Sequence, residues 1–275
     1  MSDYEQHEMP FEERRYRRNR LRRGIFLLPS IFTGANLLCG YYASIASLGG
    51  GAEDFDHAAK AIGIAILFDG LDGRIARLTG TNTEFGVQFD SLADVVTFGI
   101  APAILAYSWG FRSFTGLSSE GYEQLGHFAW ICCLAFLICS AWRLARFNVQ
   151  GMAPGGSKNF VGMPTPAAAG VVAAIVHACH WIGPPTEKVW AIAWFSVMLS
   201  LGALMTSTVR YYSFKDIPWT RKQPSVTIIL LCLLVGVIWR YSEYVLVILA
   251  CSYALIGIIL HIVRVLRHRL VARTV

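Results

Sequence analysis

Residues 66–94 read ILFDGLDGRIARLTGTNTEFGVQFDSLAD and join the end of one apolar stretch to the start of the next. Four aspartates, Asp69, Asp72, Asp90 and Asp94, lie inside or at the end of these stretches. If both stretches are helices, Asp69 and Asp72 share one helical face, and Asp90 and Asp94 share a face of the following helix. The short connection predicts antiparallel neighbours, so both acidic pairs are expected at the same end of a helix pair.

These acids are costly in a membrane unless something neutralises them. A carboxylate at bilayer depth costs about 3 kcal/mol on insertion scales, so it usually faces a partner or a wet cavity. Carboxylate oxygens in this number suit Mg²⁺ or Mn²⁺ rather than zinc, which prefers nitrogen and sulfur. The pattern therefore predicts a divalent metal site with Asp69, Asp72, Asp90 and Asp94 as ligands. Aspartates that are only solvated at the membrane interface are the alternative.

The composition is typical of a membrane protein. Of the 275 residues, 55% are apolar and 15% are charged, whereas soluble domains carry about 25% charged residues. Eight apolar stretches each come near the roughly 20 residues that a membrane-spanning helix needs. We therefore expect an all-α, polytopic membrane bundle of about eight transmembrane helices, at residues 26–48, 57–77, 87–109, 127–147, 164–183, 188–207, 224–240 and 243–263.

The basic residues predict the orientation. With eight spans, both termini lie on one side, and assigning each Lys and Arg to its nearest loop puts only Lys60, Arg112, Lys188 and Arg240 on the other side. The remaining 20 of the 24 basic residues predict cytoplasmic termini and aspartates at the cytoplasmic end. The same bias accounts for the net charge of +6, so no nucleic-acid partner is expected. We divide the chain into a cytoplasmic basic juxtamembrane segment (1–25), a transmembrane domain (26–263) and a cytoplasmic basic tail (264–275).

Small residues and an arginine accompany the acids on the same helix faces. Gly73, Ala76 and Gly86 favour either close helix packing or room for a ligand against the backbone. Arg77 lies about one turn beyond Gly73, and arginine suits phosphate oxygens. A metal-neutralised carboxylate cluster beside an arginine predicts phosphoryl chemistry on a diphosphate.

The spacing of these residues resembles the signature of the CDP-alcohol phosphotransferase family. Every fixed position of that signature is matched by Asp69-x-x-Asp72-Gly73-x-x-Ala76-Arg77, eight residues, Gly86-x-x-x-Asp90-x-x-x-Asp94. Three further segments, 28–40 (LPSIFTGANLLCG), 143–170 and 204–216, resemble the serine-accepting members of bacteria and archaea, although Ser30 stands where asparagine is common. The resemblance covers residues 28–216, and the last two predicted spans carry no motif.

The resemblance implies an enzyme that transfers a phosphatidyl group from CDP-diacylglycerol to an alcohol and releases CMP. It implies that Asp69, Asp72 and Asp90 hold one divalent metal, that Asp90 and Asp94 share in a second, and that Asp94 is the general base. It also implies a homodimer embedded in a prokaryotic plasma (inner) membrane, with the active site facing the cytoplasm. The residues that it places at the CDP-diacylglycerol are Gly73, Ala76, Arg77, Thr83, Gly86, Thr33 and Asn36.

The likeness to serine-accepting members implies L-serine as the acceptor, so a cation for its carboxylate is expected beside Asp94. Arg143 and Arg146 end the fourth predicted span, three residues apart and hence on one face. The candidate serine-binding residues are Arg143, Arg146, Asn148 and Lys158. Among them Arg146, alone or together with Arg143, is expected to bind the serine carboxylate. If these arginines only anchor the helix to headgroups, the pocket is expected at Arg210 and Lys215 instead.

Two other functions stay open. The same reaction could use another acceptor, such as glycerol 3-phosphate, inositol phosphate or choline, or CDP-archaeol as the donor. Intramembrane aspartates also occur in cation and proton transporters. A transporter is expected to hold its acids near the midplane within inverted repeats, whereas these acids lie at one face and no repeat is apparent. Synthesis of phosphatidylserine from CDP-diacylglycerol and L-serine, a step of phospholipid biosynthesis, is therefore the preferred hypothesis.

Overall fold

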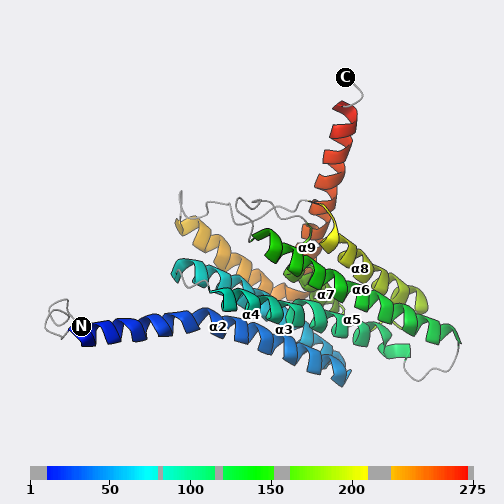
Figure 1. Ribbon diagram of the computed structural model, residues 1–275. Helices are drawn as coiled ribbons and strands as arrows, with labels where there is room; N and C mark the ends of the chain where they lie inside the picture. Colours follow the sequence, from blue (N-terminus) through cyan, green and yellow to red (C-terminus); the bar gives the residue numbers. More distant parts are fainter. Residues whose placement is uncertain (1–10, 80–82, 115–119, 152–161, 210–223, 272–275) are drawn as a thin grey trace.

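The computed structural model describes residues 11–79, 83–114, 120–151, 162–209 and 224–271. Within these ranges every regular element is a helix, which confirms the all-α prediction (Figure 1). The elements are α2 (Phe11–Gly49), α3 (Ala52–Thr79), α4 (Glu84–Asp94), η1 (Val95–Ile100), α5 (Ala101–Phe111), η2 (Arg112–Phe114), α6 (Glu120–Gly151), α7 (Thr165–Ala178), α8 (Lys188–Thr206) and α9 (Pro224–Val271).

Four of the described helical segments are long and apolar enough to cross a membrane. They are Ser30–Gly49, Glu84–Phe114, Gly121–Val149 and Lys188–Thr206. These segments coincide with the first, third, fourth and sixth predicted spans. The total of eight spans stays a prediction.

The fifth predicted span, 164–183, is too long at its C-terminal end. α7 covers 14 residues and ends at Ala178. A turn follows, in which the Gly183 backbone N–H donates to the Cys179 carbonyl oxygen at 2.8 Å, and Gly183 has a φ of +81°. Glycine adopts this backbone conformation without a steric penalty. The apolar run therefore continues beyond the point at which the helix stops.

The seventh and eighth predicted spans form the two parts of α9. The backbone leaves the helical conformation at Tyr241, with φ −133° and ψ 39°, and Figure 1 shows the two parts running in different directions. The predicted boundaries at residues 25 and 263 fall inside α2 and α9. Composition, and not a break in a helix, therefore separates the basic segments from the apolar spans.

The third predicted span contains a π-helical turn directly after the last acid of the signature. α4 ends at Asp94, and the π-helix η1 covers Val95–Ile100 before α5 begins. Within η1, Thr97 donates its hydroxyl to the Asn36 carbonyl oxygen of α2 at 3.1 Å. π-helical turns inside α-helices often lie at functional sites. The hydrogen bond from Thr97 to α2 therefore fixes the position of η1 and of Asp94, which directly precedes it.

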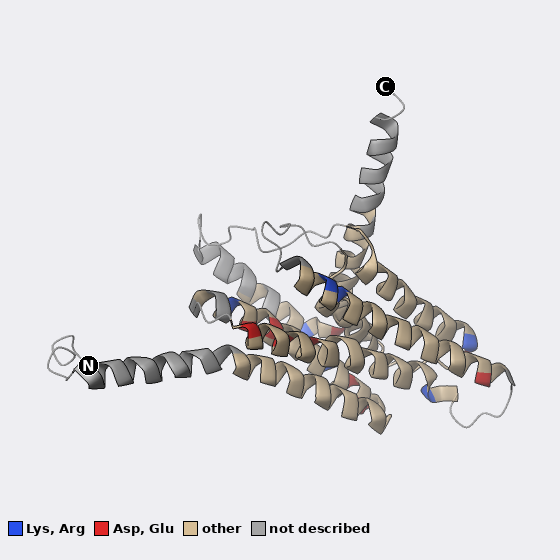
Figure 2. Ribbon diagram, in the orientation of Figure 1, with Lys and Arg blue, Asp and Glu red and all other residues tan. Residues whose placement is uncertain are grey.

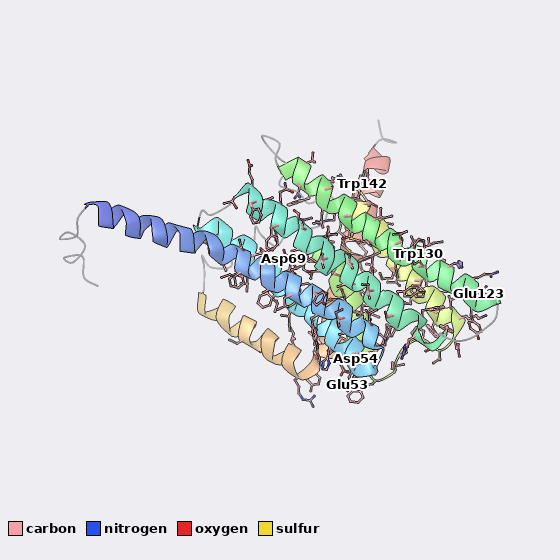
Figure 3. All side chains as sticks on the ribbon, turned by 60° about the horizontal axis from the view of Figure 1, so that its bottom comes forward. Glu53, Asp54, Asp69, Glu123, Trp130 and Trp142 are labelled. Carbon is pink, nitrogen blue, oxygen red and sulfur yellow. The ribbon has the colours of Figure 1, made fainter. Side chains whose placement is uncertain are left out.

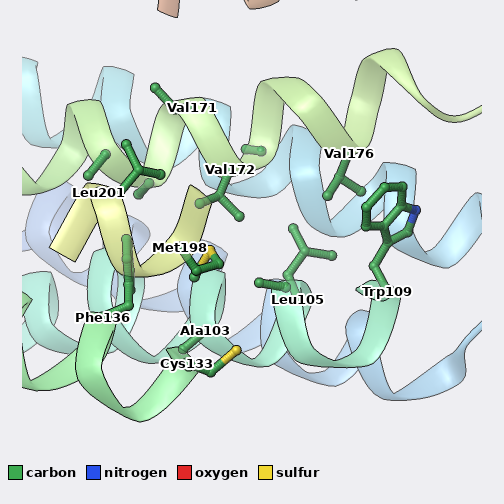
Figure 4. Close-up of a cluster of buried hydrophobic side chains, with 14 of the residues drawn as sticks. Ala103, Leu105, Trp109, Cys133, Phe136, Val171, Val172, Val176, Met198 and Leu201 are labelled. Atoms are coloured by element: carbon green, nitrogen blue, oxygen red, sulfur yellow. The ribbon is translucent and has the colours of Figure 1, made fainter. Parts of the chain in front are cut away.

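The apolar core lies between α5, α6, α7 and α8 (Figure 4). Leu105, Phe136, Val172 and Met198 meet there and are fully buried. Trp109 and Trp194 contact each other edge to face, with ring centroids 4.9 Å apart. The rigid core holds the helix ends that carry the acids in a defined arrangement.

A polar junction joins α9 to α3 and α7. His177 of α7 contacts Ser242 of α9 through Nε2, at 2.9 Å from the serine Oγ, and Asp56 of α3 through Nδ1. Trp181 donates its indole N–H to Glu243 at 2.8 Å. We call the contact of Asp56, His177 and Ser242 the α7–α9 junction. It lies toward the end of α3 that carries Glu53, opposite the end that carries Asp69 (Figure 3).

The close approach of α2 to η1 gives a test of this packing. A Cβ added at Gly40 meets the Thr97 side-chain oxygen and lies 2.7 Å from the Thr97 Cα. Gly40→Ala is therefore expected to destabilise the purified protein by about 1–3 kcal/mol, because the backbone of η1 must move. Thermal unfolding in detergent measures the change.

Gly34→Ala, on the same helix, is the matched control. A Cβ at Gly34 meets no atom within 4 Å, so this variant is expected to keep or raise the stability, since alanine is the better helix former. Equal unfolding temperatures for the two variants would contradict the α2–η1 contact.

Candidate active site

The first three acids of the signature converge at one end of the bundle. Asp69 and Asp72 come from the C-terminal half of α3, and Asp90 comes from α4. One carboxylate oxygen from each lies within 4.8 Å of the other two. Figure 2 shows acidic residues gathered at this end, and Figure 3 marks Asp69 there. The predicted meeting of the two acidic pairs therefore holds for these three residues.

Asp94 lies one turn further along α4 and is more enclosed. It is the last residue of α4, with 8% of its surface exposed. It is not one of the three acids whose oxygens converge. Asp94 is therefore set apart from the three carboxylates that could share one metal ion.

Helix α2 supplies hydrogen-bond donors to both acidic helices. Thr33 donates its hydroxyl to Oδ2 of Asp72, and Asn36, one turn later, donates its amide to Oδ1 of Asp94, each at 3.2 Å. Both donors are buried, and Asn36 is fully enclosed. The resemblance implied that these residues bind CDP-diacylglycerol, whereas the structure shows their donors on the carboxylates. They hold the acids in place whatever else they contact.

Two of the residues expected at the nucleotide, Gly73 and Thr83, are open to a ligand. A Cβ at Gly73 meets no atom within 4 Å, so a ligand can approach the α3 backbone there. Thr83 is exposed and caps α4, since its hydroxyl accepts the Gly86 N–H at 3.0 Å. The side chains of Ala76 and Arg77 lie outside the part of the chain that the structure describes in that detail.

Of the two arginines expected at the acceptor, Arg143 is the buried one. It is 8% exposed, and its Nη1 donates to the Thr165 hydroxyl at the start of α7 at 2.9 Å. Arg146 is only half-buried. Asn148 donates to the Ser91 hydroxyl at 2.8 Å and thereby ties α6 to α4. Lys158, Arg210 and Lys215 lie outside the described residues.

The segments that resemble serine-accepting proteins contact each other. The Gly162 N–H donates to the Val209 carbonyl oxygen at 2.8 Å, and the Met163 N–H donates to the Leu204 carbonyl oxygen at 3.0 Å. A Cβ at Gly162, which has a φ of +88°, would strike the Met205 carbonyl oxygen. The start of α7, to which Arg143 is bound, is thereby fixed against the end of α8.

Several buried polar atoms of these helices have no hydrogen-bond partner in the described part of the chain. They belong to α2, α4 and α6 and are Asn36 Oδ1, Asp90 Oδ1, Ser140 Oγ and Arg143 Nε. Buried polar atoms are nearly always paired, so such a group calls for an explanation. A polar ligand or ion among these helices provides one.

The donor set at this end fits a hard divalent cation. Three convergent carboxylates, with Oδ1 of Asp90 unpaired among the described residues, offer oxygen ligands alone, as Mg²⁺ and Mn²⁺ prefer. A second group, Glu53, Asp56 and His180, lies at the other end of α3. There Asp56 is already bound by Lys60 and His177, so that group fits a cation less well.

Four polar residues near the site were not foreseen from the sequence. Ser91, Thr97, Ser140 and Thr165 have small hydroxyl side chains, which recur throughout apolar helices. Ser91 lies between two acids of the signature, and Thr165 follows the Gly162-Met163-Pro164 segment. These positions are the only sequence signal that could have singled them out.

Comparison with known proteins assigns this helical bundle and its acidic site to an enzyme family. The model of the CDP-alcohol phosphatidyltransferase family matches residues 26–202. The chain belongs to this family, whose members transfer phosphatidyl groups from CDP-alcohols.

Its relatives include named enzymes from bacteria and archaea. A CDP-diacylglycerol–serine O-phosphatidyltransferase of Helicobacter pylori is 35% identical over 216 residues, which cover 76% of this chain and 81% of that protein. The protein of the same name from Methanocaldococcus jannaschii is 34% identical over 154 residues, 56% of this chain and 62% of its own. An archaetidylserine synthase of Methanothermobacter thermautotrophicus is 33% identical over 189 residues, 67% of this chain and 69% of its own.

The Asn36–Asp94 contact can be separated experimentally from a contact with the lipid substrate. Asn36→Ala removes the donor to Asp94, and a hydrogen bond to a charged group contributes about 1.5–3 kcal/mol. We expect kcat to fall about ten- to a hundredfold, while the KM for CDP-diacylglycerol stays within about threefold. Steady-state CMP release at varied lipid concentration measures both.

The control is Leu38→Ala, an exposed position on the same helix, which is expected to change neither parameter. A rise in the lipid KM of Asn36→Ala with an unchanged kcat would show instead that Asn36 acts by binding CDP-diacylglycerol.

Proposed function

We propose that the protein transfers the phosphatidyl group of CDP-diacylglycerol to the hydroxyl of L-serine, forming phosphatidylserine and CMP. The observation that carries the proposal is the convergence of Asp69, Asp72 and Asp90, with Asp94 held one turn away by Asn36. The names of the relatives from bacteria and archaea support serine as the acceptor.

The carboxylates are assigned to metal binding, and neighbouring residues to the nucleotide. Asp69, Asp72 and Asp90 hold divalent metal, Mg²⁺ or Mn²⁺, with Asp94 sharing in a second ion. When bound, the metal supplies charge neutralisation on the diphosphate and on the leaving CMP. Gly73, Ala76, Arg77, Thr83 and Gly86 receive the cytidine diphosphate part.

Asp94 serves as the general base. Asn36 occupies its Oδ1, which leaves Oδ2 to accept the proton of the serine hydroxyl. As that proton leaves, a bond forms between the serine oxygen and the phosphorus that carries diacylglycerol. The bond from this phosphorus to the CMP oxygen breaks, and the electron pair departs with CMP.

Arg143 binds the serine carboxylate. Thr165 accepts a hydrogen bond from its Nη1, and its buried Nε has no partner in the described part of the chain. The Nε edge of the guanidinium is therefore assigned to the two oxygens of a carboxylate, in the parallel geometry that arginine favours. Asp94 and Asp69 lie close enough for their charges to act on this guanidinium. Arg146, Asn148 and Lys158 remain candidates for further contacts with serine.

The setting in the membrane completes the proposal. Eight spans with cytoplasmic termini put the acids at the cytoplasmic face, where serine and CMP exchange with water while the acyl chains stay in lipid. The 20-to-4 distribution of basic residues supports this orientation. A homodimer in a prokaryotic plasma membrane, which the family resemblance implies, is part of the same proposal.

The function is tested by CMP release from purified protein. We expect release from CDP-diacylglycerol that requires both a divalent cation and L-serine, with phosphatidylserine as the lipid product. Glycerol 3-phosphate, inositol phosphate and choline are the comparison acceptors, and CDP-archaeol is the second donor. Release that favours another acceptor would overturn the serine assignment, and no release with any acceptor would favour a transporter.

Asp94→Asn tests the base. The variant cannot accept a proton at neutral pH but keeps the shape of the side chain. We expect CMP release to fall by at least about a thousandfold, within the range of general acid–base contributions with an added loss of metal charge balance, while CDP-diacylglycerol binding persists. Asp69→Asn is the comparison, since it is expected to weaken metal and lipid binding together. Activity of Asp94→Asn within a few-fold of the unaltered protein would remove it as the base.

Arg143→Gln tests the carboxylate site. We expect the KM for L-serine to rise more than tenfold, because a hydrogen bond to a charged group contributes about 1.5–3 kcal/mol, and the KM for CDP-diacylglycerol to change little. Arg146→Gln is the matched control on the same helix and is expected to have the smaller effect. A larger rise in the KM for L-serine with Arg146→Gln than with Arg143→Gln would instead assign the carboxylate site to Arg146.

A further inference from the structure

The second part of α9 lies beyond the family match at 26–202. It begins at the α7–α9 junction, where Ser242 contacts His177 at 2.9 Å. The adjacent Glu243 accepts the indole N–H of Trp181 at 2.8 Å. Two neighbouring polar contacts therefore fix the start of this helical part against the end of α7.

Helix geometry relates the position of Tyr253 on α9 to that of Thr165 on α7. A helix rises 1.5 Å per residue, so Tyr253 lies about 16 Å along α9 from Ser242. Along α7, Thr165 lies about 18 Å back from His177. The similar rises place Tyr253 level with Thr165 if the two helices run past each other in opposite directions.

The surroundings of Arg143 agree with that placement. Tyr253, like Asp94 and Asp69, lies within electrostatic range of the Arg143 guanidinium. Tyr253 also packs against the apolar core, and the next residue, Ala254, is buried. The phenol therefore packs against the protein and is not free in the lipid.

We propose that Tyr253 is a positioning residue for the acceptor site: its hydroxyl, together with Thr165, holds the Arg143 guanidinium toward the serine carboxylate. The inference rests on the proposed function. A guanidinium has five N–H donors, so Thr165 and Tyr253 can each accept one and leave an edge for the substrate. An arginine released from these partners can turn to Asp94, which would neutralise the base and empty the carboxylate site.

The test compares Tyr253→Phe with Tyr244→Phe in the full-length purified protein. Tyr244 lies on the same helix and is 68% exposed, so its hydroxyl is the matched control. We expect Tyr253→Phe to raise the KM for L-serine about tenfold, the effect of one hydrogen bond to a charged group, and to leave the KM for CDP-diacylglycerol within about twofold. Tyr244→Phe is expected to leave both unchanged.

A second readout separates positioning from general packing. L-serine binding, measured by calorimetry with CDP and Mg²⁺ present, is expected to weaken by the same factor in Tyr253→Phe, while the unfolding temperature stays that of Tyr244→Phe. A lower kcat in Tyr253→Phe, with the KM for L-serine and serine binding both unchanged, would overturn the inference in favour of a packing role.

The two proposals fail in different ways. If the unaltered protein releases CMP with serine and Tyr253→Phe matches Tyr244→Phe in serine KM and binding, the role of Tyr253 is overturned and the proposed function stands. If the unaltered protein shows no serine-dependent CMP release, the proposed function is overturned, and the inference about Tyr253 with it.

Discussion

Repulsion among carboxylates at one end of α3 and α4 is the constraint on which the rest of the structure depends. Asp69, Asp72 and Asp90 bring oxygens within 4.8 Å of one another in a chain that is otherwise poor in charge. Such a cluster is stable only with cations and fixed donors around it. The hydroxyl of Thr33 and the amide of Asn36 are such donors, and they make α2 part of the site. The π-helical turn after α4 keeps this contact in place.

The meeting of the acids could be predicted because it follows from local rules. Spacings of three and four residues set the helix face, and a short connection sets the antiparallel pairing. The partners of Asp72 and Asp94 could not be predicted in this way, since the donors are 39 and 58 residues away in sequence. The end of α7 was also beyond the pattern, because the apolar run continues through the turn that Gly183 closes.

The acceptor site shows more clearly that local spacing does not predict which side chains are buried. Arg143 and Arg146 lie three residues apart, so their spacing alone puts both on one face of α6. In the structure Arg143 is buried and bound to Thr165, whereas Arg146 is half-buried. The difference arises from the packing of α7, which the sequence pattern of α6 does not contain. Tyr253 extends this dependence to α9, a helix without any motif.

Direct binding of Mn²⁺ to the purified protein, followed by electron paramagnetic resonance, tests most directly whether the carboxylates form a metal site. The account predicts saturable binding that Mg²⁺ displaces and that Asp72→Asn weakens at least tenfold. Asp54→Asn, at a partly exposed acid near the other end of α3, is predicted to leave binding unchanged. Equal binding by the unaltered protein and Asp72→Asn would contradict it.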